Sequence, residues 1–306
     1  MKIFHSENIP LVLPAGHPFP MEKYRLLRER VASSGMFRRE DLQTALPARD
    51  EDILRVHAPA YLERLRRGRL SPAEMRRIGF PWSPRLVERA RHAAGATMAA
   101  VSAAREEGIG INLGGGTHHA FPDHGQGYCI LNDVAIGLRA HQARGNIKAA
   151  VVIDGDAHQG NGTAAIFSGD ASVFTFSIHG RSSFPFHKVP GDLDIALDED
   201  TGDDAYLEKF ADGVARALAA GPFDLAVFLA GADPYHNDRF GRLALSRAGL
   251  ARRDRLVLNA CRRGGLPLAI VMSGGYARDI ADTVAIHFET VRIAAAVMTG
   301  KCFPSD

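Results

Sequence analysis

The sequence predicts an α/β protein with a mostly parallel central sheet and helices on both faces. Short apolar runs rich in β-branched residues, such as 151–153, alternate with helical patterns from residue 109 onward. Polar, glycine-rich turns come directly after these runs, at the end of a parallel sheet where ligands bind. Because no repeat, low-complexity tract or linker interrupts the 306 residues, we expect a single domain over 1–306.

The predicted elements begin with a short strand over 2–5. A helix over 21–34 follows and ends at Gly35, and the segment 36–81 mixes short helices with turns. Pro84 begins a long alanine-rich helix to about Glu107, since proline suits a first helical turn. The later strands are expected at 109–113, 149–154, 172–178, 224–230 and 267–272, and the later helices at 132–144, 162–167, 203–220, 246–263 and 277–299.

Composition and charge limit the classes of function. The 37 Lys and Arg against 35 Asp and Glu leave a formal net charge of +2, so bulk electrostatics predict no nucleic-acid and no membrane partner. Three scattered cysteines, Cys129, Cys261 and Cys302, predict no disulfide framework and a reducing compartment. Without a signal-peptide core or an 18-residue apolar run, we expect a cytoplasmic protein. The oligomeric state stays open.

The stretch from 151 to 162, VVIDGDAHQGNG, joins a buried strand to an abrupt polar turn. Asp154, Asp156 and His158 alternate at its end, so their side chains share one face. Carboxylate oxygens and an imidazole nitrogen are ligands for a borderline metal such as zinc. A plain Asx-rich turn after a strand would have the same composition. The rest of the chain must therefore distinguish a metal site from an ordinary turn.

Polar clusters follow five predicted strands, and parallel strands bring their carboxyl ends to one edge of the sheet. That edge should gather His118, His119, Asp154, Asp156, His158, Asp233 and Tyr276. Asp156, His158 and Asp233 would give three protein ligands, the number that a catalytic zinc site uses while leaving one position open. Tandem histidines can accept and return a proton, and a phenol can donate to a developing oxyanion.

The motifs GGGTHH, GYCILND, DGDAHQGNGT, GAD and SGGY, in this order and spacing, resemble those of the zinc-dependent histone deacetylase family. The likeness runs from His17 to Tyr276, and the DxDAHQGNG form is most similar to the class IV branch and its bacterial relatives. The resemblance implies the arginase/deacetylase fold. It also implies hydrolysis of an acylated lysine, acetyl or longer, in a protein or peptide by metal-activated water.

The resemblance also implies the metal ligands and the proton carriers. Asp156, His158 and Asp233 match the zinc ligands, although two carboxylates and one imidazole are also tolerable to Fe²⁺. His119 matches the general base and acid of the family. His118 matches the partner histidine that helps to hold the attacking water.

Further residues match groups that surround the reacting centre. Tyr276 matches the tyrosine that polarises the carbonyl. Asp154 and Asn161 match the partners of His118 and His119, which fix the tautomer and basicity of the two rings. Because Asn161 stands where some branches have aspartate, we expect a less basic His119.

The family binds a structural potassium ion and holds the acyl-lysine in an aromatic tunnel. The positions that match the potassium ligands are Asp154, Asp156, His158, Ser177 and the backbone at Ile178. Tyr128 and Phe184 match the tunnel walls, and Gly127 is expected as a backbone contact only. Phe240 stands where polyamine deacetylases carry a glutamate, and we expect a buried apolar ring there.

Three other functions would use part of the same set of residues. An arginase-like ureohydrolase needs a further carboxylate two residues after the histidine of the Asp-Ala-His turn, where this chain has Gly160. A catalytically inactive acyl-lysine binder would have no need of His119 and Tyr276. A hydrolase of small acylated amines, such as acetylpolyamines, shares the mechanism, so the sequence leaves it open. Whether the substrate is a protein or a small molecule would depend on the rim loops, which we expect around 11–20, 68–84 and 181–190.

Overall fold

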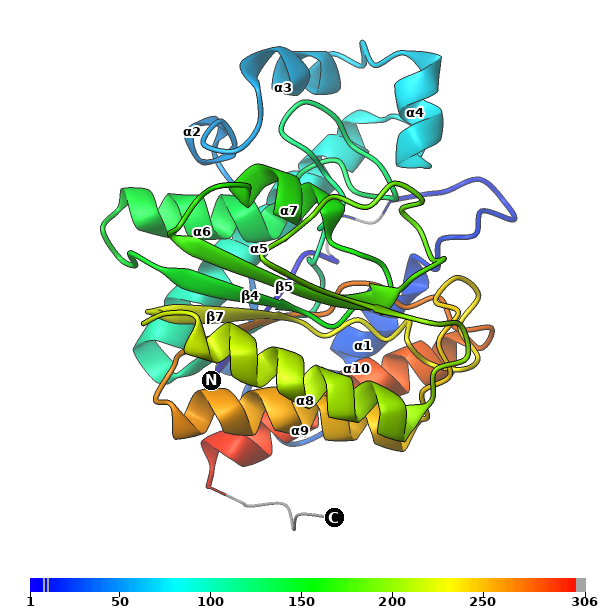
Figure 1. Cartoon of the computed structure of the whole chain (residues 1–306). Coiled ribbons are helices and arrows are strands. Elements are labelled where there is room, and N and C mark those ends of the chain that lie inside the picture. Colours follow the sequence, from blue (N-terminus) through cyan, green and yellow to red (C-terminus); the bar gives the residue numbers. More distant parts are fainter. Residues whose placement is uncertain (8, 10, 301–306) are drawn as a thin grey trace.

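Eight strands form one sheet in which every neighbouring pair is parallel (Figure 1). The structure is a computed structural model that describes residues 1–7, 9 and 11–300. Across the sheet the order is β2-β1-β3-β8-β7-β4-β5-β6. The strands are β1 (Lys2–His5), β2 (Leu42–Thr44), β3 (Ile109–Asn112), β4 (Ala150–Asp154), β5 (Val173–Gly180), β6 (Leu193–Leu197), β7 (Leu225–Leu229) and β8 (Leu268–Val271). The predicted α/β class is confirmed.

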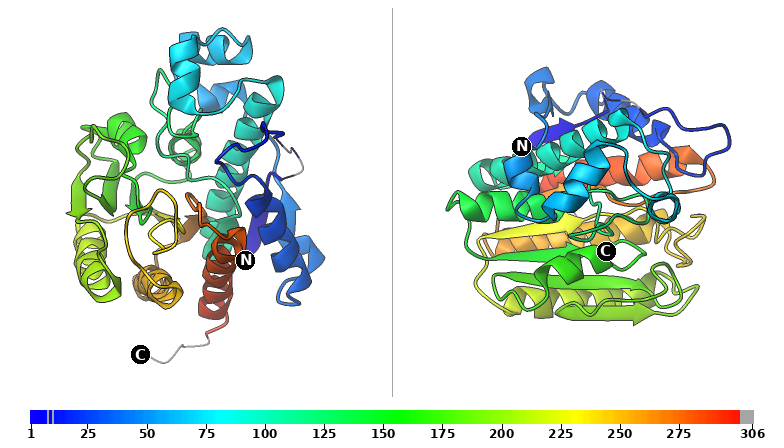
Figure 2. Two further views of the ribbon diagram at one scale, coloured as in Figure 1. Left: turned by 90° about the vertical axis from the view of Figure 1, so that its right-hand side faces the viewer. Right: turned by 90° about the horizontal axis from the view of Figure 1, so that it is seen from above.

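Helices cover both faces of this sheet (Figures 1 and 2). One layer contains α5 (Pro84–Glu107), α6 (Asp133–Ala143) and α7 (Asn161–Phe167). The opposite layer contains α1 (Glu22–Ser33), α8 (Asp203–Ala219), α9 (Arg247–Arg263) and α10 (Ile280–Met298). Beyond the first layer lie the short helices α2 (Asp50–Ile53), α3 (Pro59–Arg66) and α4 (Pro72–Ile78). A 3₁₀ turn at Arg39–Asp41 precedes β2.

The central strands are apolar on both faces because both faces are covered. In β4, Val151 and Ile153 pack in the core beside α8, α9 and α10, whereas Ala150 and Val152 pack in the core beside α5 and α6. This alternation follows from the two-residue period of a strand. Every residue of β3, β4, β7 and β8 is buried.

The two outermost strands, β2 and β6, were not predicted. Both lie at a sheet edge and carry polar or exposed side chains, so their apolar signal is weak. The last helix begins at Ile280 rather than at 277, since the Asp279 side chain accepts from the Ala281 N–H and caps it. Cys129 and Cys261 are free and buried, and Cys302 lies outside the described residues. Among the described helices, none has the length and apolar character needed to cross a membrane.

Candidate active site

Four adjacent strands at the centre of the sheet, β3, β8, β7 and β4, each end in a polar turn. The residues on these turns are His118 and His119 after β3, Tyr276 after β8, Asp233 after β7, and Asp156 and His158 after β4. Neighbouring parallel strands end at the same edge, so turns that are far apart in the sequence meet in space. The structure therefore brings the predicted cluster together.

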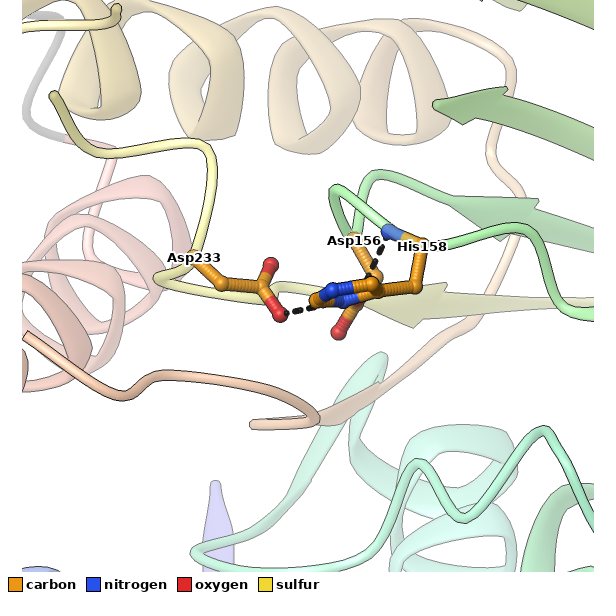
Figure 3. Close-up of side chains that lie close together, drawn as sticks. All are labelled: Asp156, His158 and Asp233. Atoms are coloured by element: carbon orange, nitrogen blue, oxygen red, sulfur yellow. Dashed lines mark hydrogen bonds and ion pairs between the residues drawn. The ribbon is translucent and has the colours of Figure 1, made fainter. Parts of the chain in front are cut away.

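Asp156, His158 and Asp233 point toward one another from two turns (Figure 3). The Nδ1 atom of His158 lies 3.1 Å from Oδ1 of Asp156 and 3.0 Å from Oδ2 of Asp233. One ligand atom from each residue falls within 4.8 Å of the other two, and all three residues are buried. This spacing allows one metal ion to contact all three side chains.

Neutral donors hold the other oxygens of the two carboxylates. The Ser273 hydroxyl and the Gly274 N–H donate to Asp156 Oδ2 at 2.7 and 2.8 Å, and the Ala157 N–H donates to Asp233 Oδ1 at 2.8 Å. Burial, together with the negative charge of Asp156, raises the pKa of Asp233 to about 7. A divalent cation would relieve this repulsion, and two carboxylates with one imidazole fit Zn²⁺ or Fe²⁺.

Gly274 approaches these carboxylates too closely to carry a side chain. A Cβ atom at this position would lie 1.9 Å from Asp233 Oδ2 and 2.6 Å from Asp156 Oδ2. Both distances are far inside van der Waals contact, so the first glycine of the SGGY motif preserves the space for the two carboxylates.

The change Gly274→Ala is expected to displace a ligand carboxylate and to weaken Zn²⁺ binding by about 10-fold to 100-fold, the range for disturbed supports of metal ligands. Equilibrium competition with a chromophoric chelator measures the affinity. Gly264→Ala is the control, because its added Cβ atom would have no neighbour closer than 3.6 Å. Equal Zn²⁺ affinity of Gly274→Ala and the unchanged protein would contradict this account.

The ring centroids of the tandem histidines lie 4.1 Å apart with the ring planes tilted by 47°, and the two rings have different partners. Nδ1 of His118 lies 2.6 Å from Asp154 Oδ2, whereas Nδ1 of His119 donates to Asn161 Oδ1 at 2.9 Å. Burial by itself lowers the pKa of His118. The negative charges of Asp154 and Asp156 have the larger effect and raise this pKa to about 9. Burial and the charge of His118 hold the pKa of His119 well below its usual range. At neutral pH these groups leave His119 neutral, with Nε2 as an acceptor.

Tyr276 is held in place by a backbone hydrogen bond and by the Lys23 ammonium that lies over its ring. Its N–H donates to Asp238 Oδ2 at 2.6 Å, and the Lys23 ammonium lies 5.0 Å from its ring centroid. Lys23 also donates to the Gly275 carbonyl at 3.1 Å, which ties helix α1 to the SGGY turn. Burial and the negative charge of Asp233 raise the pKa of Tyr276 well above its usual value, so its phenol keeps its proton.

A pocket of about 350 Å³ opens over this cluster. His119 and His158 line its buried end, and Tyr276 lines it as well. The aromatic rings of Tyr128 and Phe184 form walls, and the Phe184 ring packs edge-on against His119 with centroids 4.9 Å apart. The predicted tunnel residues therefore surround the predicted catalytic residues.

Two further predicted residues line the pocket. A Cβ atom on Gly127 would come within 2.7 Å of both His119 and Phe184, so the backbone there forms part of the wall. Phe240 is 36% exposed at the mouth, so the expectation of a buried ring is wrong. The Asp238 carboxylate accepts from the Phe240 N–H at 2.8 Å and holds this residue on an exposed loop after β7.

Two positions assigned to potassium lie outside this pocket. Ser177 is the register partner of Asp154 across β4 and β5, and both residues line a separate cavity of about 10 Å³. The Ser177 hydroxyl also lies 3.0 Å from Nδ1 of His179. Ile178 follows in β5 and is fully buried.

One buried arginine behind the site was not predicted from the sequence. Arg253 of α9 is completely buried and donates to the carbonyls of Gly155 at 3.0 Å and Gly231 at 2.7 Å. These carbonyls belong to the two turns that carry the metal-ligand residues. Asp254 accepts from the same guanidinium at 2.7 and 2.9 Å, and Thr290 of α10 donates to Asp254 at 2.6 Å. One guanidinium therefore ties both turns to the helices below the sheet.

A buried aspartate plays a similar part for the histidine turn. Asp133, at the start of α6, accepts from the N–H groups of Gly116 and Thr117 at 3.0 and 2.7 Å. The hydroxyls of Thr97 and Thr117 also donate to it. Asp133 lies within the GYCILND motif, but an acidic residue in a first helical turn is also an ordinary helix-start signal.

The fold and the site define an α/β protein with a buried Asp-His-Asp set that could hold a metal ion, paired histidines and a tyrosine around one pocket. Residues 17–291 match the family described as the histone deacetylase domain. The chain belongs to the histone deacetylase family.

Individual relatives and solved structures agree with this assignment. An uncharacterized protein of Picosynechococcus sp. is 43% identical over 93% of this chain and 95% of its own length. A protein of Pseudomonas aeruginosa named histone deacetylase-like amidohydrolase is 32% identical over 86% of this chain and 73% of its own length. The crystal structure of an HDAC homolog complexed with SAHA has a TM-score of 0.80 and 22% identity, over 99% of this chain and 85% of that chain. This likeness shows the arginase/deacetylase fold.

Proposed function

We propose that this protein is a zinc-dependent amidohydrolase that removes an acyl group, acetyl or longer, from the Nε atom of lysine. The observation that carries the proposal is the aromatic-walled pocket with a neutral imidazole, a phenol and the metal-ligand His158 at its inner part. Membership of the histone deacetylase family supports deacetylase chemistry in general.

Asp156, His158 and Asp233 would hold the metal. When bound there, Zn²⁺ would supply Lewis-acid chemistry, that is, polarisation of the scissile carbonyl and a lower pKa for water. Tyr276 would donate its phenol proton in a hydrogen bond to the carbonyl oxygen as negative charge develops there. Its raised pKa supports this role, because only the protonated phenol can donate.

His119 would accept the proton of the attacking water and later give it to the lysine amine that leaves. Its Nδ1 atom is committed to Asn161, so the proton would be carried at Nε2. The His118 cation beside Asp154 would stabilise negative charge next to the reacting centre and help to hold the water. Tyr128 and Phe184 would accept the methylene stem of the lysine and part of the acyl group.

Several finer assignments are part of the same proposal. Fe²⁺ is the alternative metal, since the ligand set suits either ion. A structural potassium ion would lie near Asp154, Ser177 and the backbone of Ile178, and the register pairing of the first two supports this position. A cytoplasmic, reducing location is supported by the free thiols of Cys129 and Cys261.

A matched substrate series tests the proposal. Purified Zn²⁺-loaded protein is incubated with lysine peptides that carry acyl groups from acetyl to long-chain, and with acetylpolyamines, while released amine is measured. Turnover of a peptide class that a chelator abolishes is the expected result. Turnover of acetylpolyamines alone would move the function to small acylated amines. Bound zinc without turnover of any substrate would favour an inactive acyl-lysine binder.

The pH dependence should report the environment of His119. Asn161→Asp places a carboxylate at its Nδ1 atom, and this charge raises the pKa of His119. A base works only while it is neutral, so activity is lost on acidification at a higher pH in the variant. We therefore expect the acidic limb of kcat/KM to move upward by about one to two pH units. Asn259→Asp, on helix α9, is the control, and an unmoved limb in Asn161→Asp would contradict the assignment of His119 as the base.

A further inference from the structure

The mouth of the pocket is rich in positive charge. Arg76, Arg77, Arg239 and Arg242 all line the pocket and are exposed, in contrast to the buried histidines at its inner end. Within the described part of the chain, no aspartate or glutamate lines this pocket. The whole chain has a net charge of only +2, so the arginines form a local patch rather than part of a basic surface.

Most of this charge has no acidic partner. Arg242 pairs with Glu199 at 2.8 Å. Arg239 donates to the neutral carbonyls of Tyr276 at 3.0 Å and Pro18 at 2.7 Å, and among the described residues it has no acidic partner within 4.0 Å. Among residues 1–7, 9 and 11–300, neither Arg76 nor Arg77 has an acidic partner within 4.0 Å.

Such a patch selects by charge. Guanidinium groups form charge-assisted, often bidentate hydrogen bonds with carboxylates, and charges of one sign along a cleft concentrate ligands of the opposite sign. A polyamine carries several positive charges of its own, so the mouth would repel it. The mouth also exposes the rings of Phe186 and Phe240, at 79% and 36%, which a substrate extending beyond the acylated amine can cover.

We propose that Arg76, Arg77 and Arg239, the mouth arginines without an acidic partner among the described residues, form an anion-binding subsite, and that the substrate is an acylated lysine in an acidic peptide segment. This inference rests on the proposed acyl-lysine hydrolysis and adds the substrate class. The acyl group and lysine stem occupy the aromatic pocket, while glutamate or aspartate residues beside the lysine meet Arg76 and Arg77.

Three acetyl-lysine peptides that differ only in their flanking residues test the subsite. Two glutamates, two glutamines or two lysines flank the acetyl-lysine, and both kcat/KM and peptide binding by fluorescence anisotropy are measured. At about 0.02 M ionic strength we expect kcat/KM to fall from Glu to Gln to Lys, by roughly 3-fold to 10-fold at each step. At about 0.5 M the differences should shrink, because salt screens exposed charges.

Paired variants locate the effect. The double change Arg76→Gln with Arg77→Gln should compress the ranking of the three peptides. The control, Arg85→Gln with Arg263→Gln, removes the same charge from exposed positions that do not line the pocket, and it should keep the ranking. A ranking that survives loss of Arg76 and Arg77 would overturn their assignment.

The outcomes separate this inference from the proposed function. Turnover of all three peptides at equal kcat/KM in low salt overturns the subsite and leaves the hydrolase proposal standing. Ranked binding without any turnover supports the subsite and overturns the hydrolase proposal. Faster turnover of free Nε-acetyl-lysine than of the Glu peptide would show that a small acylated amine, not a peptide, is the substrate, and would overturn the inference.

Discussion

The change Tyr276→Phe is expected to lower kcat by about 10²-fold to 10³-fold with little change in KM, the effect of removing one oxyanion donor. The variant keeps the aromatic ring, which packs against Phe240 with centroids 5.2 Å apart and lies over Lys23. Only the phenol hydroxyl is lost, and the raised pKa of Tyr276 means that this group is a donor at neutral pH. Steady-state kinetics on an acyl-lysine peptide, with zinc content measured in parallel, give the result.

Tyr128→Phe is the matched control for this prediction. It removes a hydroxyl from the same pocket at a wall position to which we assign no proton or hydrogen bond in the reaction. Its kcat should stay within about threefold of the parent value, since surface and wall contacts usually contribute little. A Tyr276→Phe variant as active as Tyr128→Phe would contradict the role of the phenol.

The change Arg253→Met is expected to lower the free energy of unfolding by about 3–5 kcal/mol, as when one partner of a buried ion pair is removed. It leaves the Asp254 carboxylate buried without its cation and removes the donor to the carbonyls of Gly155 and Gly231. The turns that carry the metal ligands then lose their common tie, so Zn²⁺ affinity should also fall by about 10-fold or more. Urea unfolding of metal-free protein and chelator competition measure the two effects separately.

Two companion variants make the Arg253 prediction specific. Arg252→Met changes the neighbouring residue, which is exposed and pairs with the exposed Asp204, so stability and zinc affinity should both stay close to the parent. Arg253→Met combined with Asp254→Leu removes both charges and should recover part of the stability. Because the two carbonyls still lack their donor, zinc affinity should stay low. Recovery of both properties would show that Arg253 stabilises the fold without positioning the metal site.

The residues of the candidate site could be predicted because each follows a strong local signal. Four central strands are short apolar runs, and each is followed at once by a polar turn with glycine. Parallel strands bring such turns to one edge of the sheet. The sequence alone therefore predicts that Asp156, His158 and Asp233 lie close together and could bind a metal ion. The edge strands β2 and β6 lack that signal, because an exposed strand needs no continuous apolar run.

The supports behind the site could not be predicted, because tertiary packing alone decides them. Arg253 lies among Arg252 and Arg255 on an amphipathic helix, a pattern that is typical of a solvated face. Burial of its guanidinium depends on two carbonyls and one carboxylate that meet it only in the folded chain. Phe240 shows the opposite case, since an apolar residue at a loop position can face solvent when the backbone holds it there.

We propose that one metal ion, held by Asp156, His158 and Asp233, is required for hydrolysis of an acylated lysine. The most direct measurement adds Zn²⁺ back to chelator-treated protein while lysine amine and free carboxylate are both quantified from an acetyl-lysine peptide. Our account predicts that both products appear in equal amounts and that their rate rises until one Zn²⁺ is bound per chain. Full activity before any metal is added, or none after the site is filled, would contradict it.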